Sequence, residues 1–279
     1  MLAVSPSKQA GRVLRENTNG FARRAAPDFL GIVTKTQLKR STVEYCIATA
    51  RVVFEHFSIS LPPFARWRVD DWDAAGTDYD EVRDCMLGWD VTDFGSMDFT
   101  RIGRTLFTLR NGKLGVAAYP KTYAEKLILD PEGQRAPAHF HRTKREDIIN
   151  RGGGNIIVQL TRADADNRPM KGPLRVVVDG RARTIASGES VRLLPGESVC
   201  IPPRTLHQFW GEEGHGYKID GVGYTVSSEV SSVCDDLNDN FFLGDMTRFP
   251  ALDEDVPRQH YLCHEYPRAR ESAVASAAR

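Results

Sequence analysis

The strongest chemical pattern in the sequence is a pair of histidines, His139 and His141, in the run AHFHRTKRED. Side chains two apart on a strand point to the same face, so both imidazoles would converge on one point. Glu146 follows after a turn and can return a carboxylate to that point, and His207 in IPPRTLHQFW can supply a fourth ligand. Three neutral imidazoles and a carboxylate suit a divalent ion such as Mn, Fe, Co, Ni or Zn, with coordination positions left open. Such an ion can hold substrate oxygens and act as a Lewis acid.

Two histidines with one residue between them are common by chance, so the argument depends on the spacing around them. Glycines and a proline recur at fixed distances in the order Gly133-x5-His139, His141-x4-Glu146-x6-Gly153 and, further on, Gly196-x5-Pro202-x4-His207. This order resembles the two motifs of the cupin family, with Arg204 where cupins usually have glycine. The resemblance implies a small antiparallel barrel of the jelly-roll class with the metal inside it.

The elements that must position these residues change in character near residue 103. From there the chain shows short β-rich runs separated by turn residues, with hairpin turns predicted at Asn111-Gly112 and Asp179-Gly180. We therefore expect a mainly β fold, in which a cupin jelly-roll β-barrel with a C-terminal tail spans residues 103–279. An N-terminal helical extension is expected over residues 1–102.

The extension is predicted to be helical because apolar residues recur at three- and four-residue steps in TVEYCIATARVVFEHF. Ser41 and Glu44 predict a capping box at the start of this helix, and Leu61-Pro62-Pro63 ends it. An earlier helix is expected within residues 7–24. The acidic stretch 70–98 is expected to form loops and short helices.

A longer stretch of the chain resembles the D-lyxose isomerase family of bacterial cupins. The resemblance covers roughly residues 105–265, and its most specific part is HFHRTKREDIINRGGGN. It implies a divalent ion, usually manganese, and the interconversion of aldoses with ketoses. It also implies the following roles: metal ligands for His139, His141, Glu146 and His207, catalysis or sugar contact for Lys144, and the catalytic carboxylate for Glu229. The family usually has Asn where this chain has Cys234, and its core enzymes lack the long N-terminal extension.

The implied chemistry agrees with these residue types. Isomerisation moves a proton between C1 and C2 through a cis-enediolate, whose negative charge a chelated divalent ion stabilises. A carboxylate can abstract and return that proton, and we assign this role to Glu229 as a hypothesis. Lys144 would polarise a sugar oxygen or carry a proton, with its pKa lowered by the metal. The alternatives are a solvated lysine in a basic run and an ordinary acid at a strand end.

Further residues are predicted to contact the sugar, namely Glu125, Lys126, Trp210, Asp235 and Asp239. Period-2 alternation places one of Glu125 and Lys126 inside the barrel. One of the acids at 235, 236 and 239 is expected to line the pocket, and Trp210 fits the barrel core as well as a sugar contact. His260 and His264 lie four apart and would hold a metal only on a helix, which the nearby prolines disfavour.

The 37 basic and 37 acidic side chains among 279 residues give a net charge of zero. This balance argues against electrostatic binding of nucleic acid. The zero hides an asymmetry, because residues 1–40 are basic while residues 70–98 and 229–255 are acidic.

No apolar run approaches the length of about 18 residues that spans a membrane, and the start lacks the apolar core of a secretory signal. Five scattered cysteines without a CxxC motif predict free thiols in a reducing cytoplasm. We expect a small sugar substrate, no nucleic-acid or membrane partner, and a homodimer. Two other functions stay open: an iron cupin dioxygenase, and a non-catalytic sugar-binding cupin.

Overall fold

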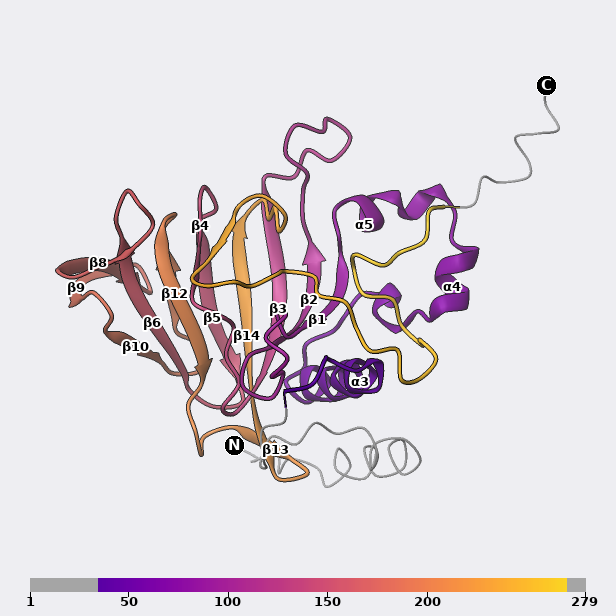
Figure 1. Cartoon of the computed structure of the whole chain (residues 1–279), viewed down its shortest axis with the longest axis horizontal. Coiled ribbons are helices and arrows are strands. Elements are labelled where there is room, and N and C mark those ends of the chain that lie inside the picture. Colours follow the sequence, from indigo (N-terminus) through magenta and orange to yellow (C-terminus); the bar gives the residue numbers. More distant parts are fainter. Residues whose placement is uncertain (1–34, 270–279) are drawn as a thin grey trace, which may run out of the picture.

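Two antiparallel β-sheets face each other and form the body of the protein, with helices at one end (Figure 1). This computed structural model describes residues 35–269. The larger sheet contains, in spatial order, β1 (Gly88–Thr92), β2 (Arg104–Arg110), β3 (Tyr123–Pro131), β14 (Val222–Ser232), β5 (Glu146–Gly152), β11 (Ser198–Ile201), β8 (Pro173–Val178) and β9 (Arg181–Ala186), and β13 (Tyr217–Ile219) pairs with β14. The smaller sheet contains β10 (Ser190–Leu193), β6 (Ile156–Ala163), β12 (Thr205–Gly211), β4 (His139–His141) and β15 (Asn240–Phe242), and β7 (Pro169–Met170) pairs with β6.

Eight of these strands form a jelly roll. Their spatial order is β3-β14-β5-β11 in one sheet and β4-β12-β6-β10 in the other, which is the order of two interlocked Greek keys. The chain crosses from one sheet to the other at almost every step between β3 and β14, so neighbouring strands are distant in sequence. The predicted mainly β jelly-roll fold is therefore confirmed.

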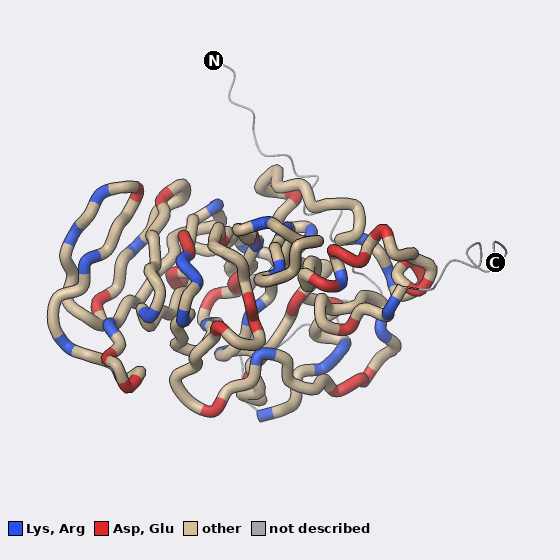
Figure 2. The backbone as a smooth tube through the Cα atoms, turned by 90° about the horizontal axis from the view of Figure 1, so that it is seen from above, with Lys and Arg blue, Asp and Glu red and all other residues tan. Residues whose placement is uncertain are grey.

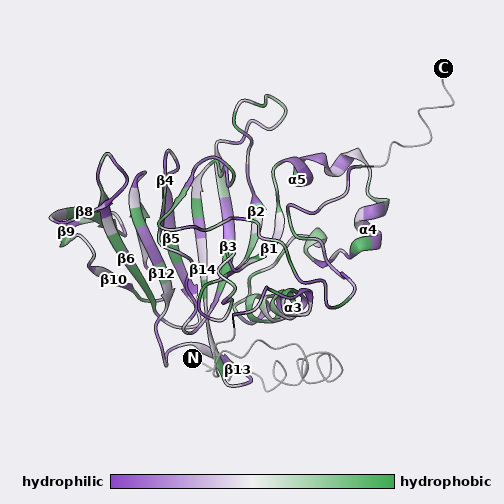
Figure 3. Ribbon diagram, viewed as in Figure 1, coloured by the Kyte–Doolittle hydropathy of each residue, from purple (hydrophilic) through white to green (hydrophobic). Residues whose placement is uncertain are grey.

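Apolar side chains from both sheets fill one part of the space between them. Strand β5 and the first half of β6 alternate buried and partly exposed residues, as strands with one inward face do. Ile148, Val158, Leu160 and Leu193 are fully buried in this cluster. Each such side chain stabilises the fold by about 1.5–3 kcal/mol relative to an exposed one. Figure 3 shows hydrophobic residues recurring along the strands of both sheets.

Helix α3 (Arg40–His56) covers the outer face of the larger sheet. Ile47 and Phe54 of its buried stripe belong to one apolar cluster with Trp89, Phe107 and Val226 of the sheet. The rings of Phe54 and Trp89 are stacked with centroids 6.4 Å apart. The predicted helix is confirmed. Its apolar stripe is buried because the helix, and not the smaller sheet, covers this face of the larger sheet.

The capping box predicted for this helix does not form. The N-cap residue is Lys39, which makes no side-chain capping hydrogen bond. Ser41 instead donates from its hydroxyl to Oδ2 of Asp255 at 2.6 Å. Glu44 Oε2 lies 2.6 Å from Nδ1 of His260. Both side chains bind the C-terminal segment because tertiary partners compete with the helix's own backbone for these short polar groups.

The acidic stretch 70–98 forms short helices, as predicted, but it also contains a strand. Its short helices are α4 (Val69–Ala74), η2 (Thr77–Tyr79) and α5 (Asp80–Asp84), and η1 (Pro63–Arg66) precedes them. Strand β1 follows and pairs with β2, so one sheet includes residues on both sides of the boundary predicted at residue 102. All five residues of β1 are buried, and the period-2 pattern that reveals a strand in a sequence is therefore missing.

One of the two predicted hairpin turns is confirmed. Asp179 and Gly180 have φ values of 48° and 74° and join β8 to β9. At the other position the structure has a longer connection, over residues 111–122. Asn111 is buried there, and its side chain donates to the carbonyl of Cys234 at 2.9 Å and accepts from its N–H at 3.0 Å. This side chain therefore fixes the chain that follows β14 and does not form a tight turn.

Only the acidic part of the charge asymmetry of the sequence can be followed in the fold, because most of the basic segment 1–40 lies outside the described residues. Figure 2 shows acidic residues at the end of the molecule that carries α4 and α5, and basic residues at the opposite end around β8 and β9. The helix expected within residues 7–24 lies outside the described residues. Within residues 35–269, no helix is long and apolar enough to cross a membrane.

Arg40 joins α3 to the C-terminal segment. Its side chain is fully buried and forms ion pairs with Glu254 at 2.7 Å and with Glu265 at 2.5 Å. The hydrogen bond from Arg40 lowers the pKa of Glu254 to about 2, from an ordinary value of 4.5. The side chain of Glu254 is 45% exposed, so water weakens this interaction.

We predict that Glu254→Gln lowers the free energy of unfolding by less than about 1 kcal/mol at neutral pH, because the carboxylate is half-exposed. The folded pKa is lower than the unfolded one, so this stabilisation is present above 4.5 and is lost as the pH falls through about 2. Thermal unfolding measured between neutral pH and pH 2 should show the two proteins converging in acid. Glu213→Gln, at an exposed position, is the control, and a pH-independent difference would contradict the prediction.

Candidate metal centre and active site

A cavity between the two sheets collects most of the sequence-predicted site residues. Strands β4, β5 and β12 bring His139, His141, Glu146 and His207 to it, and β3 and β14 bring Lys126 and Glu229. Its remaining lining residues are Phe94, Arg104, Leu106, Ile128, Ala136, Lys144, Phe209, Asp236, Asn240, Phe242 and Arg248.

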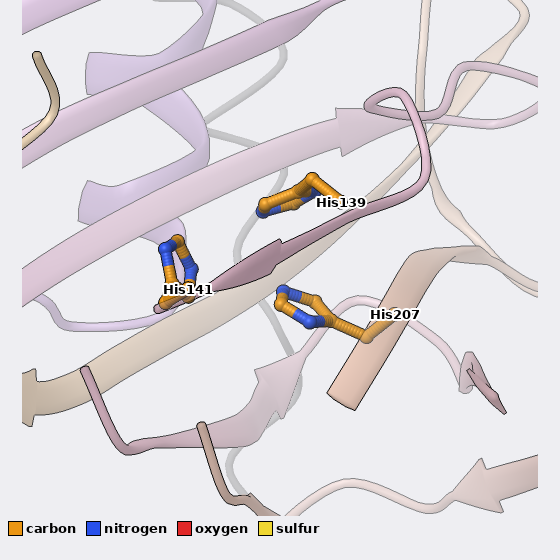
Figure 4. Close-up of side chains that lie close together, drawn as sticks. All are labelled: His139, His141 and His207. Atoms are coloured by element: carbon orange, nitrogen blue, oxygen red, sulfur yellow. The ribbon is translucent and has the colours of Figure 1, made fainter. Parts of the chain in front are cut away.

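The three histidines face one another across the end of the smaller sheet (Figure 4). His139 on β4 and His207 on β12 are direct partners in the antiparallel register. One ring nitrogen from each of the three lies within 4.8 Å of the others. The period-2 argument for His139 and His141 therefore describes the geometry correctly, and the strand pairing adds the third ring.

Two of the rings are oriented by backbone carbonyls. Nδ1 of His139 lies 2.8 Å from the carbonyl oxygen of Pro137, and Nδ1 of His207 lies 3.0 Å from that of Thr205. A carbonyl only accepts, so both Nδ1 atoms carry the proton and both Nε2 atoms offer a lone pair. Burial, with His207 and His141 close by, holds the pKa of His139 well below its ordinary value. The neutral ring is the form that binds metals.

Glu146 completes the set of candidate ligands. Its Oε1 lies 2.8 Å from Nε2 of His207, and its Oε2 lies 3.4 Å from Nε2 of His141. Oε1 is buried and has no hydrogen-bond donor among the described residues. A carboxylate oxygen facing an imidazole lone pair at this distance is repulsive unless a cation lies between them. The residues present therefore fit a divalent metal ion.

Lys144 is buried between two carboxylates. Its Nζ donates to Glu146 at 2.8 Å and to Glu229 at 2.6 Å, and the side chain is 1% exposed. Burial alone would lower the pKa of Lys144, but Glu146 and Glu229 raise it well above the ordinary value. The two carboxylates thus raise the pKa of Lys144, whereas the sequence led us to expect a pKa lowered by the metal. They also exclude the alternative of a solvated lysine.

Glu229 faces the cavity from β14, directly opposite Lys126 on β3. Burial would raise the pKa of Glu229, but the charges of Lys126 and Lys144 lower it. The hydroxyl of Ser231 donates to its Oε1 at 3.0 Å. The carboxylate is therefore ionised and held in place, as a general base must be.

Comparison with known proteins shows the family of this chain. The model of the family described as D-lyxose isomerase matches residues 38–266. The chain belongs to the D-lyxose isomerase family. It is 47% identical over 232 residues to the D-lyxose/D-mannose isomerase of Serratia proteamaculans, with 83% of this chain and 99% of that protein covered. It is 44% identical to the D-lyxose/D-mannose isomerase of Escherichia coli O157:H7, with 84% of this chain and all of that protein covered.

Among solved structures, L-ribose isomerase from Cellulomonas parahominis with L-ribose aligns with a TM-score of 0.49 at 18% identity, covering 79% of this chain and 99% of that one.

The match to the D-lyxose isomerase family begins at residue 38, well before residue 105. Helix α3 and strand β1 are therefore part of what the family shares. The expectation that residues up to 102 set this chain apart from its relatives is wrong for residues 38–102.

Sequence reasoning missed several residues that line the cavity. Asp236 lines the cavity, whereas the sequence predicted only that one of the acids at 235, 236 and 239 would do so. Its carboxylate lies 3.7 Å from Lys126, 3.4 Å from Arg248 and 3.3 Å from the thiol of Cys234. Arg248 also lines the cavity, and no period or motif marks it because it lies in a connection without regular structure. Arg104 enters from β2 and pairs with the buried Asp130 at 2.6 Å.

Four of the residues predicted to contact the sugar do not line the cavity. Glu125 points to the outside of β3 and pairs with Arg110 at 3.0 Å. Trp210 stacks under the guanidinium of Arg135, 3.9 Å from the ring centroid, because its strand alternation turns it away from His207 and Phe209. Lys126 is the one of the five that lines the cavity.

The two predicted acids of the loop act on the backbone. Asp235 accepts from the side chain and the N–H of Asn238, which closes a local turn. Asp239 accepts from the N–H groups of Thr143 and Lys144 at 2.8 and 3.0 Å, so it fixes the turn that carries the lysine. Both short acids therefore stabilise loop backbone, as Asx side chains often do.

The histidine pair at 260 and 264 does not form a metal site. No helix carries these residues, and His260 pairs with Glu44. The ring of His264 lies against Phe249, with centroids 4.5 Å apart. The prolines around them have ended regular structure, as the sequence predicted.

We predict that His207→Ala removes most of the divalent-metal binding, because it deletes an oriented Nε2 donor from the cluster. Metal content after dialysis, measured by mass spectrometry of the elements, checks this. His215→Ala is the matched control, since His215 is half-exposed and pairs with Glu212, away from the three-histidine cluster. Equal metal content in the two variants would contradict the assignment of the centre.

Proposed function

We propose that this protein is a metal-dependent aldose–ketose isomerase that converts D-lyxose to D-xylulose and D-mannose to D-fructose. Membership of the family and the names of the two relatives above support the sugar class. The observation that carries the reaction type is the buried Glu229 carboxylate, which shares Lys144 with the candidate metal ligand Glu146. A base and a metal centre in one cavity are what proton transfer between C1 and C2 requires.

We propose that His139, His141, Glu146 and His207 hold the divalent ion, with manganese as the first choice. The ion would act as a Lewis acid that draws negative charge from the adjacent sugar oxygens. The family and the three-histidine cluster support a metal, whereas the choice of manganese rests on the sequence resemblance. Lys144 neutralises part of the charge of Glu146 and keeps its carboxylate aimed at the histidines.

In this proposal Glu229 takes the proton from one sugar carbon and returns it to the other. Its low pKa keeps it ionised at neutral pH, and the hydrogen bonds from Lys144 and Ser231 hold one oxygen, which leaves Oε2 for the sugar. Lys144 is charged and sits next to the reacting groups, so it can donate a hydrogen bond to a sugar oxygen that becomes negative.

The rest of the cavity supplies groups that match sugar hydroxyls. Lys126 and Arg248 donate, and Asp236 accepts. Phe94 and Phe242 form an apolar wall that would exclude water from the reacting carbons. We propose these five as sugar contacts in place of Glu125, Trp210, Asp235 and Asp239.

We also propose that the protein acts as a homodimer in the cytoplasm. All five cysteines are free thiols, which suits a reducing compartment. Tyr123 and Val230 are exposed, 47% and 41%, on the outer face of β3 and β14. Apolar side chains exposed on a sheet face are a usual element of a subunit contact. Sedimentation velocity measures the oligomeric state directly.

We predict that the metal-free protein refilled with Mn²⁺ converts D-lyxose and D-mannose to ketoses. In D₂O, the exchanging carbon should gain deuterium, because the proton passes through a carboxylate that equilibrates with solvent. NMR of the sugar products checks both points. Oxygen consumption without ketose formation would favour a dioxygenase, and the absence of both reactions would favour a binding protein.

We predict that Glu229→Gln lowers kcat by at least about 100-fold, the usual contribution of a general base, and leaves metal content unchanged. Glu125→Gln is the matched control, since this residue lies on the outer face of the neighbouring strand. Initial rates with D-lyxose and metal analysis measure the two effects. Activity within a few-fold of the wild type in Glu229→Gln would show that another group is the base.

A further inference from the structure

The cavity is covered by the segment of residues 240–249, which we call the strap. In Figure 1 the chain after β14 crosses in front of the sheets toward the helices. Asn240, Phe242 and Arg248 of the strap line the cavity, and the ring of Phe242 lies 5.5 Å from that of His139. The cavity volume is about 50 Å³. It holds only a few water molecules, at about 10–15 Å³ each, and therefore fewer atoms than a five-carbon sugar.

A five-carbon sugar needs more room than this, so part of the wall must move. The strap forms an edge of the wall, because its strand β15 pairs with β4 alone. Leu243, Gly244, Asp245 and Thr247 are exposed. Backbone hydrogen bonds hold the strap at Leu243, which donates to Ala138 at 2.8 Å, and at Thr247, which donates to Phe94 at 3.0 Å. By contrast, the strands that line the rest of the cavity, β2, β3, β4, β5, β12 and β14, are paired on both sides.

Arg248 is the charged anchor of the strap. Its guanidinium forms an ion pair with Asp90 of β1 and lies 3.4 Å from Asp236. Asp90 is 1% exposed and does not line the cavity. Among the described residues, Arg248 is the one cation that the structure pairs with Asp90. A buried carboxylate without its cation is costly, so this pair favours the closed position of the strap.

The same pair determines how Arg248 faces the cavity. With its Nη2 held by Asp90, the guanidinium leaves Nη1 buried and without a hydrogen-bond partner among residues 35–269. A free donor of this kind, held at a fixed angle, is suited to a hydroxyl group of a bound sugar.

We propose that Asp90 is a positioning residue that holds Arg248 and the strap closed over the cavity, and that a sugar enters when this ion pair separates. Asp90 acts through Arg248 and touches no substrate. The proposal rests on the proposed function only for the identity of the entering molecule. Closure itself also controls the passage of a metal ion or a chelator, which gives a test that does not depend on catalysis.

The first test is Asp90→Asn, which keeps the size of the side chain and removes its charge. The protein is loaded with Co²⁺, and the loss of cobalt absorption is followed after addition of pyridine-2,6-dicarboxylate. We expect at least a tenfold faster loss than in the wild type, with an unchanged equilibrium affinity for Co²⁺. Asp245→Asn is the matched control, since Asp245 is an exposed acid of the strap itself. An unchanged rate in Asp90→Asn would overturn the proposal.

The separate effects on KM and kcat provide a second measurement, because a residue with a purely structural role would not change KM alone. In Asp90→Asn we expect KM for D-lyxose to rise about tenfold with kcat changed less than threefold, since Glu229 and the metal ligands stay in place. An equal fall in kcat with KM unchanged would contradict a role in positioning. If the wild type shows no isomerase activity while cobalt release responds to Asp90→Asn, the proposed function fails and the closure stands.

The second test locks the strap and does not depend on Asp90 variants folding. A Cβ added at Gly95 would lie 3.0 Å from Cγ2 of Thr247, so thiols at these two positions would lie within reach of each other. Gly95 has a φ of 75°, which strains any other residue, so the oxidised form is compared with the equally strained reduced form. The double variant Gly95→Cys with Thr247→Cys, once oxidised, should lose cobalt at least tenfold more slowly than its reduced form. Dithiothreitol should restore the rate, and oxidised wild type is the control. Equal rates in the oxidised and reduced forms would overturn the proposal.

Discussion

Lys144 lies between the carboxylates of Glu146 and Glu229, and this buried triad holds two acids close together inside the cavity. Isolated charges of this kind are costly in a protein interior, and breaking such a pair typically costs about 3–5 kcal/mol. The lysine lets two acids stay ionised side by side, one facing the histidines and one facing the space for a substrate. A candidate metal ligand and a candidate base thus coexist within one small volume.

The jelly roll is what makes this arrangement possible. Glu146 lies on β5, Glu229 on β14 and the histidines on β4 and β12, so the site draws on both sheets. Because strand side chains alternate, one inward face per strand delivers charged groups at one end of the barrel and apolar groups, such as Ile148 and Val158, further along. The apolar half stabilises the fold, and the charged half is held in place by it.

The elements outside the jelly roll support the walls of the cavity. Helix α3 covers the outer face of β1, β2 and β14, and the C-terminal segment is fixed to this helix by Arg40 and Glu44. That segment continues from the strap, so the same chain that covers the cavity is attached at its far end to the helix. Strand β1 contributes Asp90, which lies behind the cavity wall and pairs with Arg248 of that wall, and this gives the acidic stretch before the barrel a specific structural task.

The sequence by itself determined the β-rich architecture, helix α3 and the group His139, His141, Glu146 and His207. Local spacing carries this information, because strand and helix periods fix the facing of residues that share one element. The sequence did not determine the roles of Asp236, Arg248 and Asp90, since loops have no period and β1 is buried on both faces. The acids at 235 and 239 show the same limit, because only the packed loop decides whether a carboxylate binds backbone or faces a cavity. Tertiary structure decides such contacts, because they join segments far apart in the chain through packing.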